Sequence, residues 1–112
     1  MMLLTKESIL SVQDLPRELV EVAKWGGSVW VRGMTAGERD MFEDKIRTEG
    51  MKNLRALMAS MTIIDENGER LFTDKEVKVL AGKSAEALDL IVEVASKLSG
   101  LLDSDIETLE GN

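Results

Sequence analysis

The sequence lacks three residue types that carry much of protein chemistry. None of its 112 residues is cysteine, histidine or tyrosine. Without cysteine the chain has no disulfides and no thiolate metal ligands, which fits a reducing cytoplasm. Without histidine it has neither the most frequent general base nor an imidazole ligand. Its serines and threonines show no nucleophile-elbow or lysine-box spacing. We therefore expect no enzyme activity and no cofactor.

Long apolar runs and an excess of positive charge are also missing. No segment approaches the ~20 apolar residues of a membrane-spanning helix, and Met1 to Leu4 is too short for a signal-peptide core. Lysine and arginine number 14 against 21 aspartates and glutamates, so the net charge is −7. Binding to nucleic acid or to anionic membranes depends on basic residues. We expect neither kind of partner.

One acidic segment has a superficial likeness to a calcium-binding loop. It runs from Asp65 to Asp74, with a glycine at position 68. When Gly68 is placed at the sixth position of such a loop, Ile63 occupies the first position, where a carboxylate ligand is required. The segment is therefore interpreted as an acidic turn, and no metal site is predicted. We interpret Asp103 and Asp105 as helix-capping residues rather than as a functional pair.

The strongest local pattern that is present predicts a β-hairpin over residues 18–32. Two alternating runs flank Gly26 and Gly27, and paired glycines favour a two-residue turn with positive φ. If these glycines are the central turn residues, Val22 lies opposite Val31. One face of the hairpin then carries Val20, Val22, Val29 and Val31, and the other carries Glu21, Ala23, Trp25, Trp30 and Arg32, with Glu21 opposite Arg32.

The rest of the chain is predicted to be mainly helical. Capping residues and apolar spacing of three and four predict helices over 6–12, 36–49, 51–61 and 85–99, a short helix between Thr73 and Gly82, and another after Ser104. Residues 62–64 are expected to be extended. The expected buried residues are Met41, Phe42 and Ile46 in the second helix, Leu54, Leu57, Met58 and Met61 in the third, and Leu88, Ile91, Val92, Ala95 and Leu98 in the fifth. The fold class is therefore α+β, a mainly helical single domain over 1–112 with one N-terminal β-hairpin.

Tryptophan and methionine supply the candidate partner-binding residues. Trp25 and Trp30 lie on the predicted face away from the valines, where they either anchor an interface or are covered by another helix. Methionine occurs seven times and suits adaptable binding surfaces, although helical spacing places Met58 and Met61 in the core. The predicted partner-binding residues are Trp25, Trp30, Met34 and Met51.

The order of short motifs along the chain resembles the tail assembly chaperones of long-tailed bacteriophages and prophages. The resemblance covers nearly the whole chain. Its motifs are Leu3-Leu4-Thr5-Lys6, Trp25-Gly26-Gly27-Ser28-Val29, Val31-Arg32-Gly33-Met34-Thr35, Glu38-Arg39-Asp40, Phe42-Glu43, Asp65-Glu66-Asn67-Gly68, Leu71-Phe72-Thr73, Lys83-Ser84-Ala85 and Leu98-Ser99-Gly100-Leu101.

This resemblance implies a non-enzymatic protein of the host bacterial cytoplasm that is not kept in the mature virion. It implies binding to the tape measure protein and help for tail-tube polymerisation, with the major tail tube protein recruited by a longer, frameshifted form. A homo-oligomer is compatible with this. Two alternatives remain at this point: a permanent minor tail or head–tail joining protein, and a nucleic-acid mimic or anti-repressor, which is suggested only by the negative charge.

Overall fold

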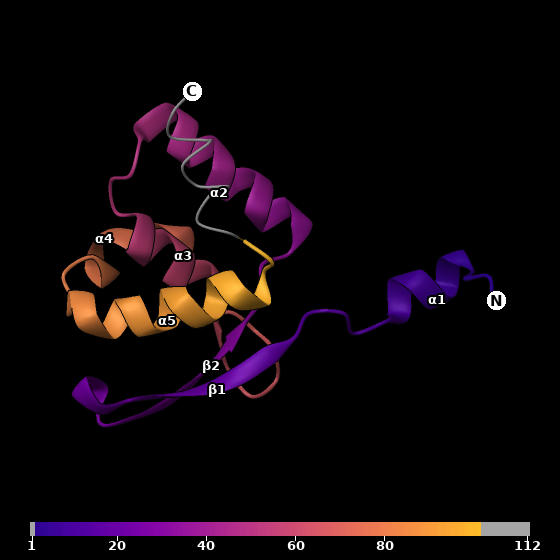
Figure 1. Cartoon of the computed structure of the whole chain (residues 1–112), viewed down its shortest axis with the longest axis horizontal. Helices are drawn as coiled ribbons and strands as arrows, with labels where there is room; N and C mark the ends of the chain where they lie inside the picture. Colours follow the sequence, from indigo (N-terminus) through magenta and orange to yellow (C-terminus); the bar gives the residue numbers. More distant parts are fainter. Residues whose placement is uncertain (1, 102–112) are drawn as a thin grey trace.

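The computed structural model describes residues 2–101 (Figure 1). Within this range an antiparallel sheet of three strands, in the order β1-β2-β3, is combined with helices, so the α+β class is confirmed. The predicted hairpin is extended by one short strand. The elements are α1 (Lys6–Ser11), β1 (Arg17–Val22), the 3₁₀ turn η1 (Ala23–Trp25), β2 (Gly27–Arg32), α2 (Ala36–Glu49), α3 (Leu54–Thr62), β3 (Ile63–Ile64), the 3₁₀ turn η2 (Asp74–Glu76), α4 (Val77–Leu80) and α5 (Ala85–Leu98). The helix predicted after Ser104 lies outside the described residues.

The hairpin turn differs from the predicted two-residue turn. Residues 23–25 form η1, and Gly26 ends it with φ 75° while its N–H donates to the Ala23 carbonyl at 3.0 Å. Gly27 already belongs to β2. Val22 therefore lies opposite Gly27, and the predicted pairing of Val22 with Val31 is wrong. Glu21 lies opposite Ser28, so the predicted pair of Glu21 with Arg32 is wrong as well.

The predicted core face of the hairpin is nevertheless correct. The partner of Val22 has moved by four residues, and an even shift leaves every side chain on its original face because the side-chain period of a strand is two. Val20, Val22 and Val31 are buried, and Val29 packs against the same core.

The helix boundaries follow from their capping residues. Thr35 and Glu38 form the predicted capping box of α2, and Ser84 accepts a hydrogen bond from the Ala87 N–H at the start of α5. Gly50 ends α2 with φ 72°. Helix α3 begins at Leu54, three residues later than predicted, because Asn53 adopts a left-handed conformation with φ 55° and a helix cannot continue through it.

Helix α3 is the centre of the helical part. Every residue from Ala56 to Thr62 is buried, including Met58 and Met61 as predicted. The hydroxyls of Ser60 and Thr62 lie in this apolar interior, and they donate to backbone carbonyls of their own helix at 2.7 and 2.8 Å. Helix α5 lies between α3 and the valine face of the sheet, and α2 packs on α3 (Figure 1).

Two predicted burial patterns differ in detail. Met41 is 45% exposed on α2, where Phe42 and Ile46 are the buried residues. On α5, Leu88, Ile91 and Ala95 are buried as expected, whereas Val92 and Leu98 are half-buried. Helix α1 has no buried residue and stands apart from the rest of the described chain (Figure 1).

Candidate partner-binding surfaces

The outer face of the sheet carries an apolar stripe across all three strands. Leu19, Trp30 and Ile64 lie opposite one another in the register, on the face away from the valines. Leu19 is 55% exposed and Trp30 half-buried, whereas Ile64 is only 3% exposed. The Arg17 guanidinium lies 5.5 Å from the centre of the Trp30 ring, a cation–π contact. We call Leu19, Trp30 and Ile64 the outer-face stripe.

The structure does not bring the four predicted binding residues together. Trp30 lies on the outer face as predicted. Trp25 belongs to η1 and packs against the hydrophobic core, so its predicted place beside Trp30 is wrong. Met34 is only 7% exposed and belongs to the core, which leaves it little surface for a partner. Met51 is 40% exposed and follows α2. A binding role for these residues remains a prediction.

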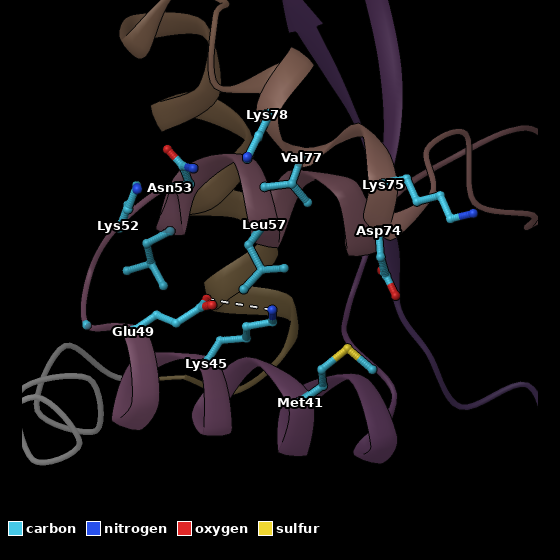
Figure 2. Close-up of a pocket in the computed structure, with 12 residues that line it drawn as sticks. Met41, Lys45, Glu49, Lys52, Asn53, Leu57, Asp74, Lys75, Val77 and Lys78 are labelled. Carbon is cyan, nitrogen blue, oxygen red and sulfur yellow. Dashed lines mark ion pairs between the residues drawn. The ribbon is translucent and has the colours of Figure 1, made fainter.

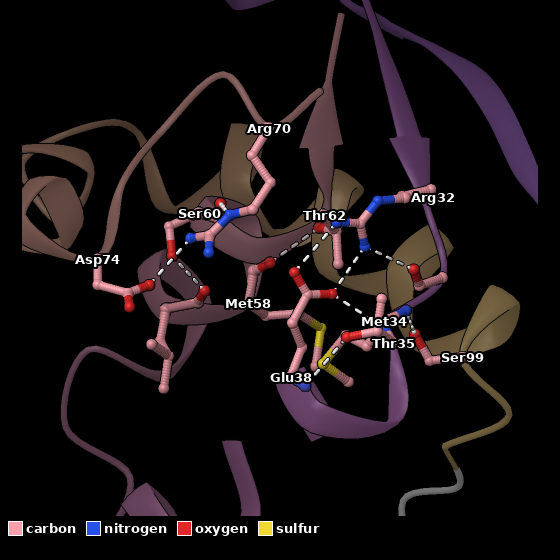
Figure 3. A network of polar contacts seen from close by, with 12 residues as sticks. Arg32, Met34, Thr35, Glu38, Met58, Ser60, Thr62, Arg70, Asp74 and Ser99 are labelled. Carbon is pink, nitrogen blue, oxygen red and sulfur yellow. Dashed lines mark hydrogen bonds and ion pairs between the residues drawn. The ribbon is translucent and has the colours of Figure 1, made fainter. Parts of the chain in front are cut away.

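A polar network fixes the end of β2 to the start of α2 (Figure 3). The Arg32 guanidinium donates two hydrogen bonds to the Glu38 carboxylate, at 2.7 and 3.0 Å, and the Thr35 N–H donates a third at 2.9 Å. Burial alone would raise the pKa of Glu38. The hydrogen bonds from Arg32 and Thr35, together with the charges of Arg32 and Arg70, outweigh burial and hold this pKa below its ordinary value.

The same network joins the strand to the carboxyl end of α5. The Met34 N–H donates to the Ser99 hydroxyl at 2.8 Å. Gly33 approaches α5 so closely that a β-carbon at this position would lie 2.7 Å from the Leu98 carbonyl oxygen. A largely buried salt bridge and a close backbone contact are typical of a rigid connection between elements. We call this connection of β2 with α2 and α5 the joint. We assign this network to stability rather than to chemistry.

A groove lies between α2 and the α3–α4 side of the molecule (Figure 2). Its volume is about 930 Å³. Sequence reasoning did not find it, because its walls come from residues 41–57 and residues 74–78, which are separated in the sequence, and because these residues form no motif. We call it the lysine groove; its lining residues are Met41, Lys45, Glu49, Gly50, Lys52, Asn53, Leu54, Leu57, Asp74, Lys75, Val77 and Lys78.

In the acidic turn that begins at Asp65, the carboxylate of this residue binds backbone groups. The Asp65 carboxylate accepts the N–H groups of Asn67 and Glu69 at 2.8 and 3.0 Å, and this closes the turn that the sequence predicts. Within residues 2–101 no group of three or more acidic residues is arranged to hold a metal ion. In the same range no helix has the length and apolar character needed to cross a membrane.

The fold and these surfaces define a small α+β unit in which helices cover one face of a short antiparallel sheet, while Leu19 and part of Trp30 remain accessible on the other. A solved structure with this fold is that of the bacteriophage HK97 tail assembly chaperone, with a TM-score of 0.66. The match covers 87% of this chain and 95% of that one, at 12% sequence identity. No protein-family model matches the sequence, and no curated protein is significantly similar to it. The chain thus has the fold of a phage tail assembly chaperone.

Proposed function

We propose that this protein is a tail assembly chaperone of a long-tailed bacteriophage or prophage. The observation that carries the proposal is the match of nearly the entire chain to the fold of the HK97 protein. Fold alone does not fix function. Two independent observations support the same conclusion: the order of sequence motifs resembles this family, and the described surface offers apolar features suited to a protein partner.

In this proposal the partner is the tape measure protein, and the result of binding is polymerisation of the tail tube around it. A tape measure protein is long and helical, so it exposes apolar helix faces until the tube encloses it. The outer-face stripe offers a matching apolar surface, in which Leu19 is exposed and the larger Trp30 ring is half-buried. Tryptophan is enriched among residues that dominate binding energy. Recruitment of the major tail tube protein by a longer, frameshifted form belongs to the same proposal.

Co-expression with the tape measure protein tests this function. We expect the tape measure protein to be largely insoluble when produced alone, and to be soluble and co-purified when this chain is present. An unrelated acidic protein of similar size serves as the control for general solubility effects. A tape measure protein that remains insoluble with this chain, or that the control rescues equally, contradicts the proposal.

The alternative is a permanent minor tail or head–tail joining protein. Mass spectrometry of purified virions separates the two functions. A chaperone is abundant in the infected cell and absent from purified particles, whereas a structural component is present in a fixed number of copies per particle.

A further inference from the structure

The lysine groove has the size of a short helical segment. An α-helix about 10 Å across with a pitch of 5.4 Å occupies roughly 400 Å³ per turn. The groove volume of about 930 Å³ thus corresponds to roughly two turns. Its apolar wall consists of Leu54, Leu57 and Val77, with the exposed Met41 side chain rising from α2 on the opposite side (Figure 2). This arrangement suits helix-in-groove recognition.

The rim of the groove has an excess of unpaired positive charge. Lys45 is paired with Glu49 at 3.6 Å across one turn of α2, and Asp74 is paired with Arg70 at 3.0 Å. These contacts use the two acidic residues of the lining. Within residues 2–101 the three other lysines of the lining form no ion pair. They are Lys52, Lys75 and Lys78.

This concentration of positive charge stands against the balance of the whole chain, whose net charge is −7. The amino end of α3 adds to it. Asn53 precedes α3 with φ 55° and makes no capping hydrogen bond through its side chain, so the positive end of the helix dipole faces the same region as Lys52. An apolar floor with a positive rim favours an apolar ligand that is bordered by negative charge.

We propose that the lysine groove binds an amphipathic helix of a partner protein in which glutamates or aspartates border the apolar face. The identity of that partner, the tape measure protein, rests on the proposed chaperone function. The binding of an acidic amphipathic helix to the groove does not. The groove is separate from the outer-face stripe, since they lie on different elements and share no residue. A long helical partner therefore meets two surfaces of the chaperone.

A synthetic peptide tests the groove directly. The probe is a fluorescein-labelled peptide of about 18 residues, long enough to form partial helix, with a leucine stripe bordered by glutamates. The comparison peptide has lysine at each glutamate position. Fluorescence anisotropy with the purified full-length chain measures both affinities. We expect saturable binding of the glutamate peptide that weakens with added salt, and much weaker binding of the lysine peptide.

Two double variants with the same change in net charge locate the site. Lys52→Glu with Lys78→Glu reverses the rim of the groove, and we expect it to weaken the glutamate peptide by about tenfold or more. Lys6→Glu with Lys97→Glu reverses two lysines outside the groove and should leave the affinity within about twofold of wild type. Circular dichroism confirms that both variants fold.

Several results overturn the proposal: absence of saturable binding to the glutamate peptide, equal binding of the lysine peptide, or equal losses in the two double variants. Residues 102–112 of this chain carry Asp103, Asp105, Glu107 and Glu110 and no lysine or arginine. If the peptide binds only after these four are changed to asparagine and glutamine, the groove receives the chain's own end, and the partner assignment is wrong. The peptide experiment contains no tape measure protein, so a negative result in it does not contradict the proposed chaperone function. Failure of the tape measure protein to co-purify, in turn, does not contradict peptide binding to the groove.

Discussion

At the scale of single residues, the Glu38 carboxylate is the acceptor that links Arg32 at the end of β2 to the start of α2. Its carboxylate accepts hydrogen bonds from Arg32 and from the Thr35 N–H, and its side chain is only 15% exposed. Removing a charged acceptor from such a site leaves the guanidinium partly unsatisfied. We expect Glu38→Gln to lower the free energy of unfolding at pH 7 by about 2 kcal/mol.

The pKa of Glu38 sets the pH dependence of this loss. The pKa is lowered in the folded state, so its stabilising contribution is fully present above the unfolded-state pKa and is lost as the pH falls through the folded-state pKa. The difference between wild type and Glu38→Gln in urea unfolding should be largest above about pH 5 and shrink toward pH 3. A difference that is equal at both pH values would show that the charge of Glu38 is not what stabilises the joint.

Trp30 and Trp25 form a matched pair for testing the outer-face stripe. Trp30 lies on the outer face and Trp25 packs against the core, although both belong to the hairpin. We expect Trp30→Ala to cost about 2 kcal/mol of binding to the tape measure protein, close to a thirtyfold loss, with little change in melting temperature. Trp25→Ala should mainly lower the melting temperature. If Trp30→Ala binds normally while folded, the stripe is not the binding site.

At the scale of elements, the contact between β2 and α5 explains a glycine whose role the sequence did not reveal. A β-carbon on Gly33 would overlap the Leu98 carbonyl oxygen, and a backbone atom cannot move aside as the end of a side chain can. We expect Gly33→Ala to destabilise the protein by about 1–3 kcal/mol. The control is Gly37→Ala on α2, where the new methyl group meets nothing within 4 Å and helix propensity improves. Thermal unfolding of both variants measures the effect, and equal stabilities would show that the close approach is relieved without cost.

Helix α5 offers a second matched pair on adjacent residues. Ile91 is fully buried, whereas Leu90 is 42% exposed. Ile91→Asp forces an unpaired charge into the apolar interior, and we expect the domain to unfold. Leu90→Asp should remain folded by circular dichroism. A folded, soluble monomer of Ile91→Asp would contradict the assignment of this face to the core.

The elements also show what sequence patterns can and cannot determine. The starts of α2 and α5 were predictable because Thr35, Glu38 and Ser84 act on backbone groups within three residues. The valine face was predictable because side chains alternate along each strand and the shift in register is an even number of residues. The register was not, because Ala23, Lys24 and Trp25 have no strong turn signal, yet they form the 3₁₀ turn that moves the pairing by four residues. Burial around the whole of α3 depends on α5, α4 and α2 packing around it, which no local spacing encodes.

The candidate binding residues likewise divide into those that the sequence can place and those that only the fold reveals. The position of Trp30 on the outer face follows from strand alternation, so the sequence was enough to place it. Met34 looked available at a helix edge, but the joint between β2 and α5 buries it. The lysine groove exists only because the fold places residues 74–78 across from α2 and the segment that follows it. Its lysines are ordinary surface residues in the sequence and acquire a shared role only through the fold.

At the scale of the whole molecule, an acidic chain adopts the fold of a phage tail assembly chaperone and carries two separate surfaces that we propose bind a partner. In the proposed function the chaperone acts on a partner that is much longer than itself, so several weak contacts suit it better than one deep site. In the same proposal, contacts of moderate strength permit the chaperone to be released when the tail tube replaces it. If the proposed function is correct, tails do not form without this protein.

Electron microscopy of particles from a phage or prophage that lacks the gene tests this requirement, with the fraction of heads that carry tails as the measured quantity. We expect that tailless heads accumulate, that the wild-type chain supplied in trans restores tails, and that Trp30→Ala restores them less well. Tails of normal number and length in the absence of the gene would contradict it.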